Sequence, residues 1–200
     1  MRRTPKTLLL CALAALAACC APAETREAAV PEPADAAGGW YLGAAGGMLL
    51  PGCGNSLRRA AEVSVRAGRY VDDFLAFELE GACAPNACSR DGNGALSGVA
   101  VRGLYHLAGI DFYDNLFGCE RFDPFVAFGA ATRFGPRHAF ADGSHRASTG
   151  PVAGVGAFYH LTEHVDLRVD AQAMLGVDSP CGMLFSVVAG LQWNFGGAGE

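Results

Sequence analysis

The chain has 200 residues, enough for one domain preceded by a leader. It is 51% hydrophobic and only 18% charged, with 27 glycines, 12 phenylalanines and a mean hydropathy of +0.21. This composition excludes a disordered chain and argues against an ordinary helical domain, because glycine is a poor helix former, and the formal net charge of −5 argues against binding to nucleic acid.

The first 23 residues have the pattern of a secretory signal peptide, since cations precede an apolar stretch at 7–18 and small residues follow it. Two alternative cleavage sites fit the sequence. Cleavage after Ala23, at an A-x-A sequence, would leave 12 basic and 20 acidic residues, whereas cleavage before Cys19, at a lipobox-like sequence, would leave a lipid-modified cysteine. Residues 24–37 are rich in Ala, Glu and Pro and lack aromatic residues, so we expect a short periplasmic linker there.

From residue 38 onward, apolar and polar side chains alternate with a period of two, which predicts strands rather than helices. In the stretch 165–173, for example, apolar residues alternate with Asp166, Arg168 and Asp170. Eight strands are expected, each about 10 to 15 residues long, whereas strands of soluble sheets usually have about 5 or 6 residues. They span 39–50, 60–71, 73–82, 95–108, 122–134, 150–161, 164–176 and 182–196.

The connections between these strands alternate in kind. With the N-terminus in the periplasm, the periplasmic turns fall at 71–73, 108–121 and 162–163, and the first and last of them are tight. The longer, surface-exposed loops fall at 51–59, 84–94, 135–149 and 177–181. Short inner turns with longer outer loops are usual in transmembrane β-barrels.

Two closures fit the strands. A soluble barrel or sandwich would turn the apolar face inward, whereas a membrane barrel turns it toward lipid and the polar face into the lumen. The polar face carries both signs of charge, which can pair inside a narrow eight-stranded barrel. We therefore expect an all-β fold, an eight-stranded antiparallel up-and-down transmembrane β-barrel at 38–196 with a tail at 197–200, whose paired charges plug the lumen. The predicted lumen charge network is Glu62, Arg66, Glu78, Glu80, Arg102, Arg133, Asp166, Arg168 and Asp170.

Aromatic residues gather at the periplasmic end of the expected barrel. Rings at one depth are what a membrane interface selects, and a soluble sandwich has no reason to segregate them. The predicted interface aromatics are Trp40, Tyr41, Tyr70, Tyr105, Tyr159, Trp193 and Phe195.

Four segments carry a family pattern: GGWYLG at 38–43, RFDPFVAFG at 121–129, GVGAFYHLT at 154–162 and GLQWNF at 190–195. In these segments the chain resembles the small eight-stranded outer-membrane β-barrel family, which includes the membrane domain of outer-membrane protein A. The resemblance implies a bacterial outer-membrane location, outer-membrane lipid and the barrel-insertion machinery as partners, and a structural or surface-interaction role. The family's aromatic insertion signal corresponds to Phe195, although residues 196–200 follow it here.

Five cysteines would remain after cleavage at Ala23, in an oxidising envelope that permits disulfides. Cys83 and Cys88 share an expected outer loop, so we predict a local bridge between them. Cys53 and Cys181 fall in the first and fourth outer loops, where a bridge would join the first strand to the last and report closure. Cys119 would stand alone at the periplasmic end, and no C-x-x-C pair indicates a metal site.

No catalytic residue, metal or cofactor is expected. A solvated loop is favoured over a metal site for His138, Asp142 and His145. His160 and His164 straddle a strand turn, so a ligand pair is not expected there.

Three other functions stay open beside the structural barrel: a soluble periplasmic lipocalin-like ligand binder, a narrow pore, and a barrel enzyme that modifies lipid A. Gly38-x-Trp40 mimics the opening motif of lipocalins. A hydrolase would need a nucleophile, a base and an acid together, and no G-x-S-x-G motif occurs. The local candidates are Asp142, Ser144, His145 and Ser148.

Overall fold

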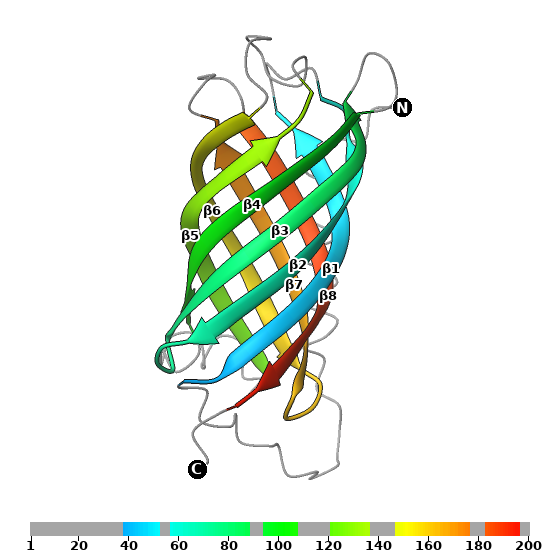
Figure 1. Cartoon of the computed structure of the whole chain (residues 1–200). Coiled ribbons are helices and arrows are strands. Elements are labelled where there is room, and N and C mark those ends of the chain that lie inside the picture. Colours follow the sequence, from blue (N-terminus) through cyan, green and yellow to red (C-terminus); the bar gives the residue numbers. More distant parts are fainter. Residues whose placement is uncertain are drawn as a thin grey trace.

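The computed structural model describes residues 38–52, 57–88, 94–107, 121–136, 147–176 and 183–196. These residues form eight strands, each antiparallel to the next, and the last strand pairs with the first to close a barrel (Figure 1). The strands are β1 (Trp40–Pro51), β2 (Ala60–Tyr70), β3 (Leu75–Cys88), β4 (Gly94–His106), β5 (Phe122–Phe134), β6 (Ala147–His160), β7 (Val165–Leu175) and β8 (Met183–Phe195). The predicted fold class is therefore confirmed.

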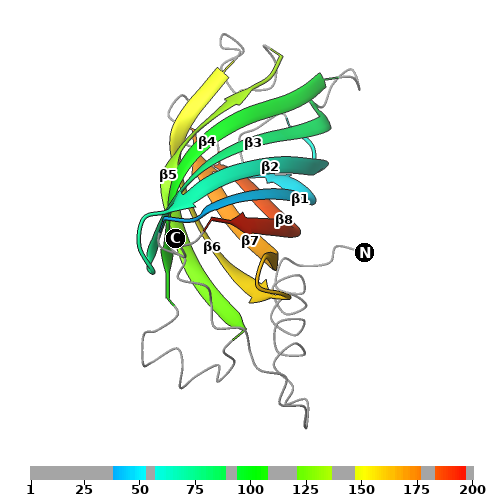
Figure 2. The same ribbon diagram turned by 60° about the horizontal axis from the view of Figure 1, so that its bottom comes forward.

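The barrel has two distinct ends, and we call the end where β1 begins and β8 finishes the lower end (bottom of Figure 1). Figure 2 shows this end turned forward, with the strands arranged around a central axis and β1 beside β8. The expected leader at 1–23, the linker at 24–37 and the tail at 197–200 lie outside the described residues. In the described part of the chain, no helix has the length and apolarity needed to cross a membrane.

The strand β3 runs six residues further than the sequence predicts. Pro85 and Asn86 indicate a loop, but the ladder with β4 resumes after them, at Cys88 opposite Gly94. The register shifts between Ala84 and Cys88, and Asn86 takes a φ of 68°, a conformation that asparagine tolerates better than most residues. The turn-forming residues therefore make a bulge inside a strand rather than the end of one.

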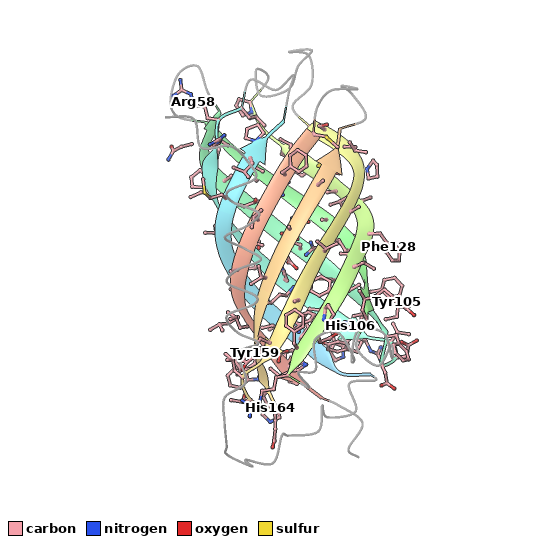
Figure 3. The ribbon with its side chains drawn as sticks, turned by 180° about the vertical axis from the view of Figure 1, so that it is seen from behind. Arg58, Tyr105, His106, Phe128, Tyr159 and His164 are labelled. Carbon is pink, nitrogen blue, oxygen red and sulfur yellow. The ribbon has the colours of Figure 1, made fainter. Side chains whose placement is uncertain are left out.

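The outer wall of the barrel is apolar along every strand. Successive side chains of a strand point to opposite faces, and the outward set includes Leu42, Val65 and Val155, each more than half exposed. Figure 3 shows Phe128 and Tyr105 on the outside of the ribbon. The outer face is therefore apolar and the charged side chains of the strands point inward, whereas a soluble protein keeps most of its charges outside.

Glycines on the inward face make room for aromatic rings in the lumen. A Cβ atom added to Gly68 would lie 2.1 Å from Cζ of Tyr41, its register partner on β1. A Cβ atom on Gly156 would lie 2.4 Å from Cζ of Phe125, its register partner on β5. The glycines of one strand thus leave space for the large side chains of the neighbouring strand.

Candidate functional site

The interior of the barrel holds a central group of charged side chains, further charge pairs beside it, and an apolar cluster toward each end. All nine residues predicted for the lumen charge network are placed inside, each between 1% and 7% exposed. Six of them form what we call the central charge belt: Arg66, Glu78, Glu80, Arg102, Arg168 and Asp170.

Glu78 is the hub of the belt. Its carboxylate accepts hydrogen bonds from the guanidinium groups of both Arg102 and Arg168, and from the hydroxyl group of Tyr41 at 3.0 Å. Arg102 also contacts Glu80, with 2.6 Å between Nη2 and Oε2. A carboxylate held by two arginines and a tyrosine has its lone pairs occupied, which is the condition under which a buried charge is tolerated.

Asp170 closes the belt on the other side. It lies 2.6 Å from Nη1 of Arg66 and 3.2 Å from Nε of Arg168. The belt thus contains three cations and three anions, and it is neutral as a unit. Because burying ions costs about as much as pairing them returns, we attribute to the belt a role in specifying one packing of the interior rather than in adding net stability.

The remaining predicted charges pair separately, above and below the belt. Glu62 contacts Nη1 of Arg133 at 2.7 Å and accepts a hydrogen bond from Ser186. Asp166 pairs with Nδ1 of His160 at 2.7 Å rather than with an arginine, and it accepts a hydrogen bond from Asn194 at 2.6 Å.

A second histidine–carboxylate pair was missed by the sequence reasoning. Nδ1 of His106 lies 2.5 Å from a carboxylate oxygen of Asp123, and the imidazole is 3% exposed. Both residues fall on the inward positions of β4 and β5, so the alternation of side chains could have placed them in the lumen. Their contact depends on the register of the two strands, which a single sequence does not reveal.

The lower aromatic cluster packs inside the barrel beneath the belt. It comprises Tyr41, Ala76, Leu104, Phe125, Ala127 and Phe158, with Tyr70 packed against it. The guanidinium carbon of Arg168 lies 4.8 Å from the ring centroid of Phe125 and 5.0 Å from that of Phe158. This arginine therefore joins the belt to the cluster, with its charge against two ring faces.

Two of the predicted interface aromatics are placed in this cluster, which corrects the prediction. Tyr41 is 1% exposed, because side chains alternate along a strand and Trp40 already takes the outward position. Tyr70 also points inward, where its hydroxyl oxygen accepts a hydrogen bond from Gln192 at 3.1 Å.

The other five predicted interface aromatics do not enter the lumen. Four of them are exposed and Tyr159 is half-buried, and all five belong to the lower ends of their strands. Figure 3 labels two of them, Tyr105 and Tyr159, near this end. The outward set is Trp40, Tyr105, Tyr159, Trp193 and Phe195.

The upper apolar cluster packs inside the barrel at the opposite end. It is built on the inward positions of the strands and on Leu57, which precedes β2. The backbone amide of Arg58 donates to the carbonyl oxygen of Ala87 in the β3 bulge, so the bulge holds this segment over the barrel. The members are Leu49, Leu57, Ala60, Ala84, Ala87, Leu96, Ala100, Ala131, Val152, Met174 and Leu184.

The predicted bridge between Cys83 and Cys88 is not formed, because Cys83 is a free cysteine. Cys83 is not in a loop: it lies in the ladder of β3, opposite Val63 and Ser97, on an outward position. The predicted bridge between Cys53 and Cys181, and the lone Cys119, lie outside the described residues.

The candidates for catalysis and metal binding are dispersed. Ser148 lies on an inward position of β6 and is 6% exposed, so it is inside the barrel wall rather than in an outer loop. His164 is exposed in a turn, whereas His160 pairs inside with Asp166. Within the described ranges, no group of three or more His, Cys, Asp or Glu residues is arranged to hold a metal ion. The remaining candidates lie outside those ranges: His138, Asp142, Ser144 and His145.

The barrel is similar to several solved outer-membrane structures. Neisserial surface protein A matches at a TM-score of 0.58 and 13% identity, over 78% of this chain and 97% of the other. The N-terminal β-barrel domain of OprF from Pseudomonas aeruginosa matches at 0.53 and 15%, over 80% and 98% of the two chains. OprG from the same organism matches at 0.54 and 12%, over 82% and 98%.

No protein-family model matches the sequence, and no curated protein sequence does. The likeness to the solved structures concerns the fold, and the chain has the fold of the small eight-stranded outer-membrane β-barrels.

Proposed function

We propose that this chain is a bacterial outer-membrane β-barrel with a structural or surface-interaction role, a closed lumen and no catalytic activity. The observation that carries the proposal is the orientation of the wall. Large apolar side chains such as Val65, Leu79 and Leu191 are more than half exposed on strands all around the barrel. Soluble monomers rarely expose contiguous apolar patches larger than a few hundred Å². Lipid is the solvent that suits such a wall.

The same orientation weighs against a lipocalin-like ligand binder. That function needs an apolar cavity inside the barrel and charged residues in water. Here the belt carboxylates Glu78 and Glu80 are each 2% exposed, and valines occupy the outside. A soluble fold with this orientation would have to bury its ion pairs and also expose a large apolar surface to water. No gain on the inside offsets these two costs.

The filled interior supports a structural barrel rather than a pore. Ions entering from below would meet the lower aromatic cluster, then the neutral belt, then the upper apolar cluster. Eight strands leave an interior that side chains can fill. We place the lower end in the periplasm, because its two described connections, at 71–74 and 161–164, are the short turns expected on that side.

Fractionation and conductance together test the proposal. We expect the protein to stay in the outer-membrane pellet after a carbonate wash, to migrate differently on gels when unheated and heated, and to give no large stable conductance in planar bilayers. Release by carbonate would contradict the membrane location. A stable conductance of the folded protein would show that the lumen is an open pore rather than closed.

A further inference from the structure

One charged side chain of the described strands stands on the outside of the barrel wall. Among the residues described for the eight strands, the outward positions hold apolar, small or uncharged polar side chains, with the exception of Arg69 on β2. A cation on the lipid-facing side of a barrel is costly at the bilayer midplane and costs little at the interface. The position of Arg69 along the wall therefore decides what this residue contacts.

Arg69 lies at the lower boundary of the apolar wall. It is the last outward position of β2, which ends at Tyr70, and the exposed Arg59 immediately precedes the start of β2 at Ala60. The two arginines stand ten positions apart. With a rise of about 3.3 Å per residue and a strand tilt of about 40°, this separation spans about 25 Å along the barrel axis. The apolar band of outer-membrane barrels has about this height.

The surroundings of Arg69 are aromatic. Its guanidinium carbon lies 5.4 Å from the ring centroid of Trp40, its register partner on β1. Phe77 is its partner on β3, and Phe195 is the partner of Trp40 on β8. No carboxylate of the described residues pairs with Arg69, although three acidic residues occupy the lower turns nearby in the chain and across the barrel. Within the described part of the chain, the guanidinium group thus rests on an indole ring and no carboxylate occupies its N–H donors.

We infer that Arg69 and Trp40 form a binding site for the phosphate group of a phospholipid in the leaflet at the lower end of the barrel. A guanidinium group presents its donors in a planar fork that matches a phosphate group, and stacking on an aromatic face leaves this fork available. The indole ring occupies the boundary between acyl chains and headgroups, the depth at which tryptophan accumulates in membranes. The site rests on the proposed membrane location, and it assigns a partner to one residue pair on the wall.

The composition of lipid around Trp40 provides a site-specific test. The chain contains two tryptophans, so a Trp193→Phe background leaves Trp40 as the fluorescent reporter. The protein is inserted into vesicles that mix brominated phosphatidylglycerol with a galactosyl diacylglycerol, which lacks phosphate. Quenching of Trp40 then measures how strongly phosphatidylglycerol is enriched beside it. We expect an enrichment of about fivefold over the bulk mole fraction.

Matched variants separate the phosphate site from general effects of charge. We expect Arg69→Gln to remove the enrichment, and Arg69→Lys to keep part of it because the charge remains while the planar fork is lost. Arg59→Gln makes the same change in charge at the opposite end and is expected to leave the enrichment at Trp40 unchanged.

Equal enrichment in Arg69→Gln and in the parent protein would overturn the inference, as would an absence of enrichment in the parent. Gel migration of unheated samples shows that each variant is folded. A parent protein that fails to insert into vesicles overturns the proposed function as well. A parent that inserts without enrichment overturns only the phosphate site.

Discussion

Replacing Glu78 by glutamine removes one negative charge from the middle of the central charge belt. The amide keeps the size of the side chain, so the packing is preserved. Arg102 and Arg168 both donate hydrogen bonds to this carboxylate, and the substitution leaves three cations facing two anions. The amide nitrogen that replaces one carboxylate oxygen is a hydrogen-bond donor, and it faces the N–H donors of the two arginines. The perturbation is therefore electrostatic and local.

The expected loss of stability follows from these contacts. Removing one partner of a buried ion pair destabilises a protein by about 3–5 kcal/mol, because the other charge stays buried without compensation. The weakened hydrogen bond from Tyr41 to this position contributes about 1 kcal/mol more. We expect the free energy of unfolding in lipid vesicles to fall by about 4–6 kcal/mol, measured by urea titration followed by tryptophan fluorescence.

Two further variants show whether the effect arises from charge balance. Glu163→Gln makes the same chemical change in an exposed turn and is expected to change stability by less than about 0.5 kcal/mol. The double variant Glu78→Gln with Arg102→Gln restores equal numbers of cations and anions and is expected to recover part of the loss. A Glu78→Gln protein as stable as the parent, or a double variant at least as unstable as the sum of its single variants, would refute the charge-belt reasoning.

Three other outcomes follow from the packing. Gly68→Ala places a Cβ atom 2.1 Å from the ring of Tyr41 and is expected to lower the free energy of unfolding by about 1–3 kcal/mol. Gly46→Ala, on the open outer face, is expected to be nearly neutral. Equal urea midpoints for the two variants would contradict this prediction. Val65→Arg, on the outer face of β2, is expected to cost about 2–4 kcal/mol in vesicles, and a neutral effect would indicate that water rather than lipid surrounds the wall. Mass mapping of non-reduced protein is expected to find Cys83 alkylated by an apolar maleimide. A peptide cross-linked through Cys83 would show that this residue is in a disulfide rather than free.

The period of two in the sequence is sufficient to place the strands and to sort their side chains into two faces. It located the ends of most strands within about three residues, and it put charges such as Glu62, Arg102 and Asp170 on one face. Local patterning carries this information because each residue's face depends only on its neighbours along the strand. The pairing partners do not follow from it. Asp166 meets His160 rather than an arginine because the register and tilt of two strands bring them together.

Two differences between prediction and structure have local causes. Trp40 and Tyr41 are adjacent, so they cannot both face lipid, and strict use of the alternation would have moved Tyr41 into the lumen. Pro85 and Asn86 are turn-forming residues, but the ladder continues past them because a bulge absorbs the extra residues. Composition alone does not distinguish a bulge from a loop, since both use the same residue types.

A scan of nitroxide labels along β2 tests the central claim, an apolar wall in lipid around a closed interior. Labels are placed one at a time at residues 61–67 of the protein in vesicles, and their collision rates with oxygen and with a water-soluble nickel chelate are measured. We predict high oxygen accessibility at 61, 63, 65 and 67, and low accessibility to both reagents at 62, 64 and 66, whose native side chains are 1–4% exposed. High nickel accessibility at the even positions would reveal an open, water-filled lumen, and oxygen maxima at those positions would place the polar face against lipid; either result would contradict the account.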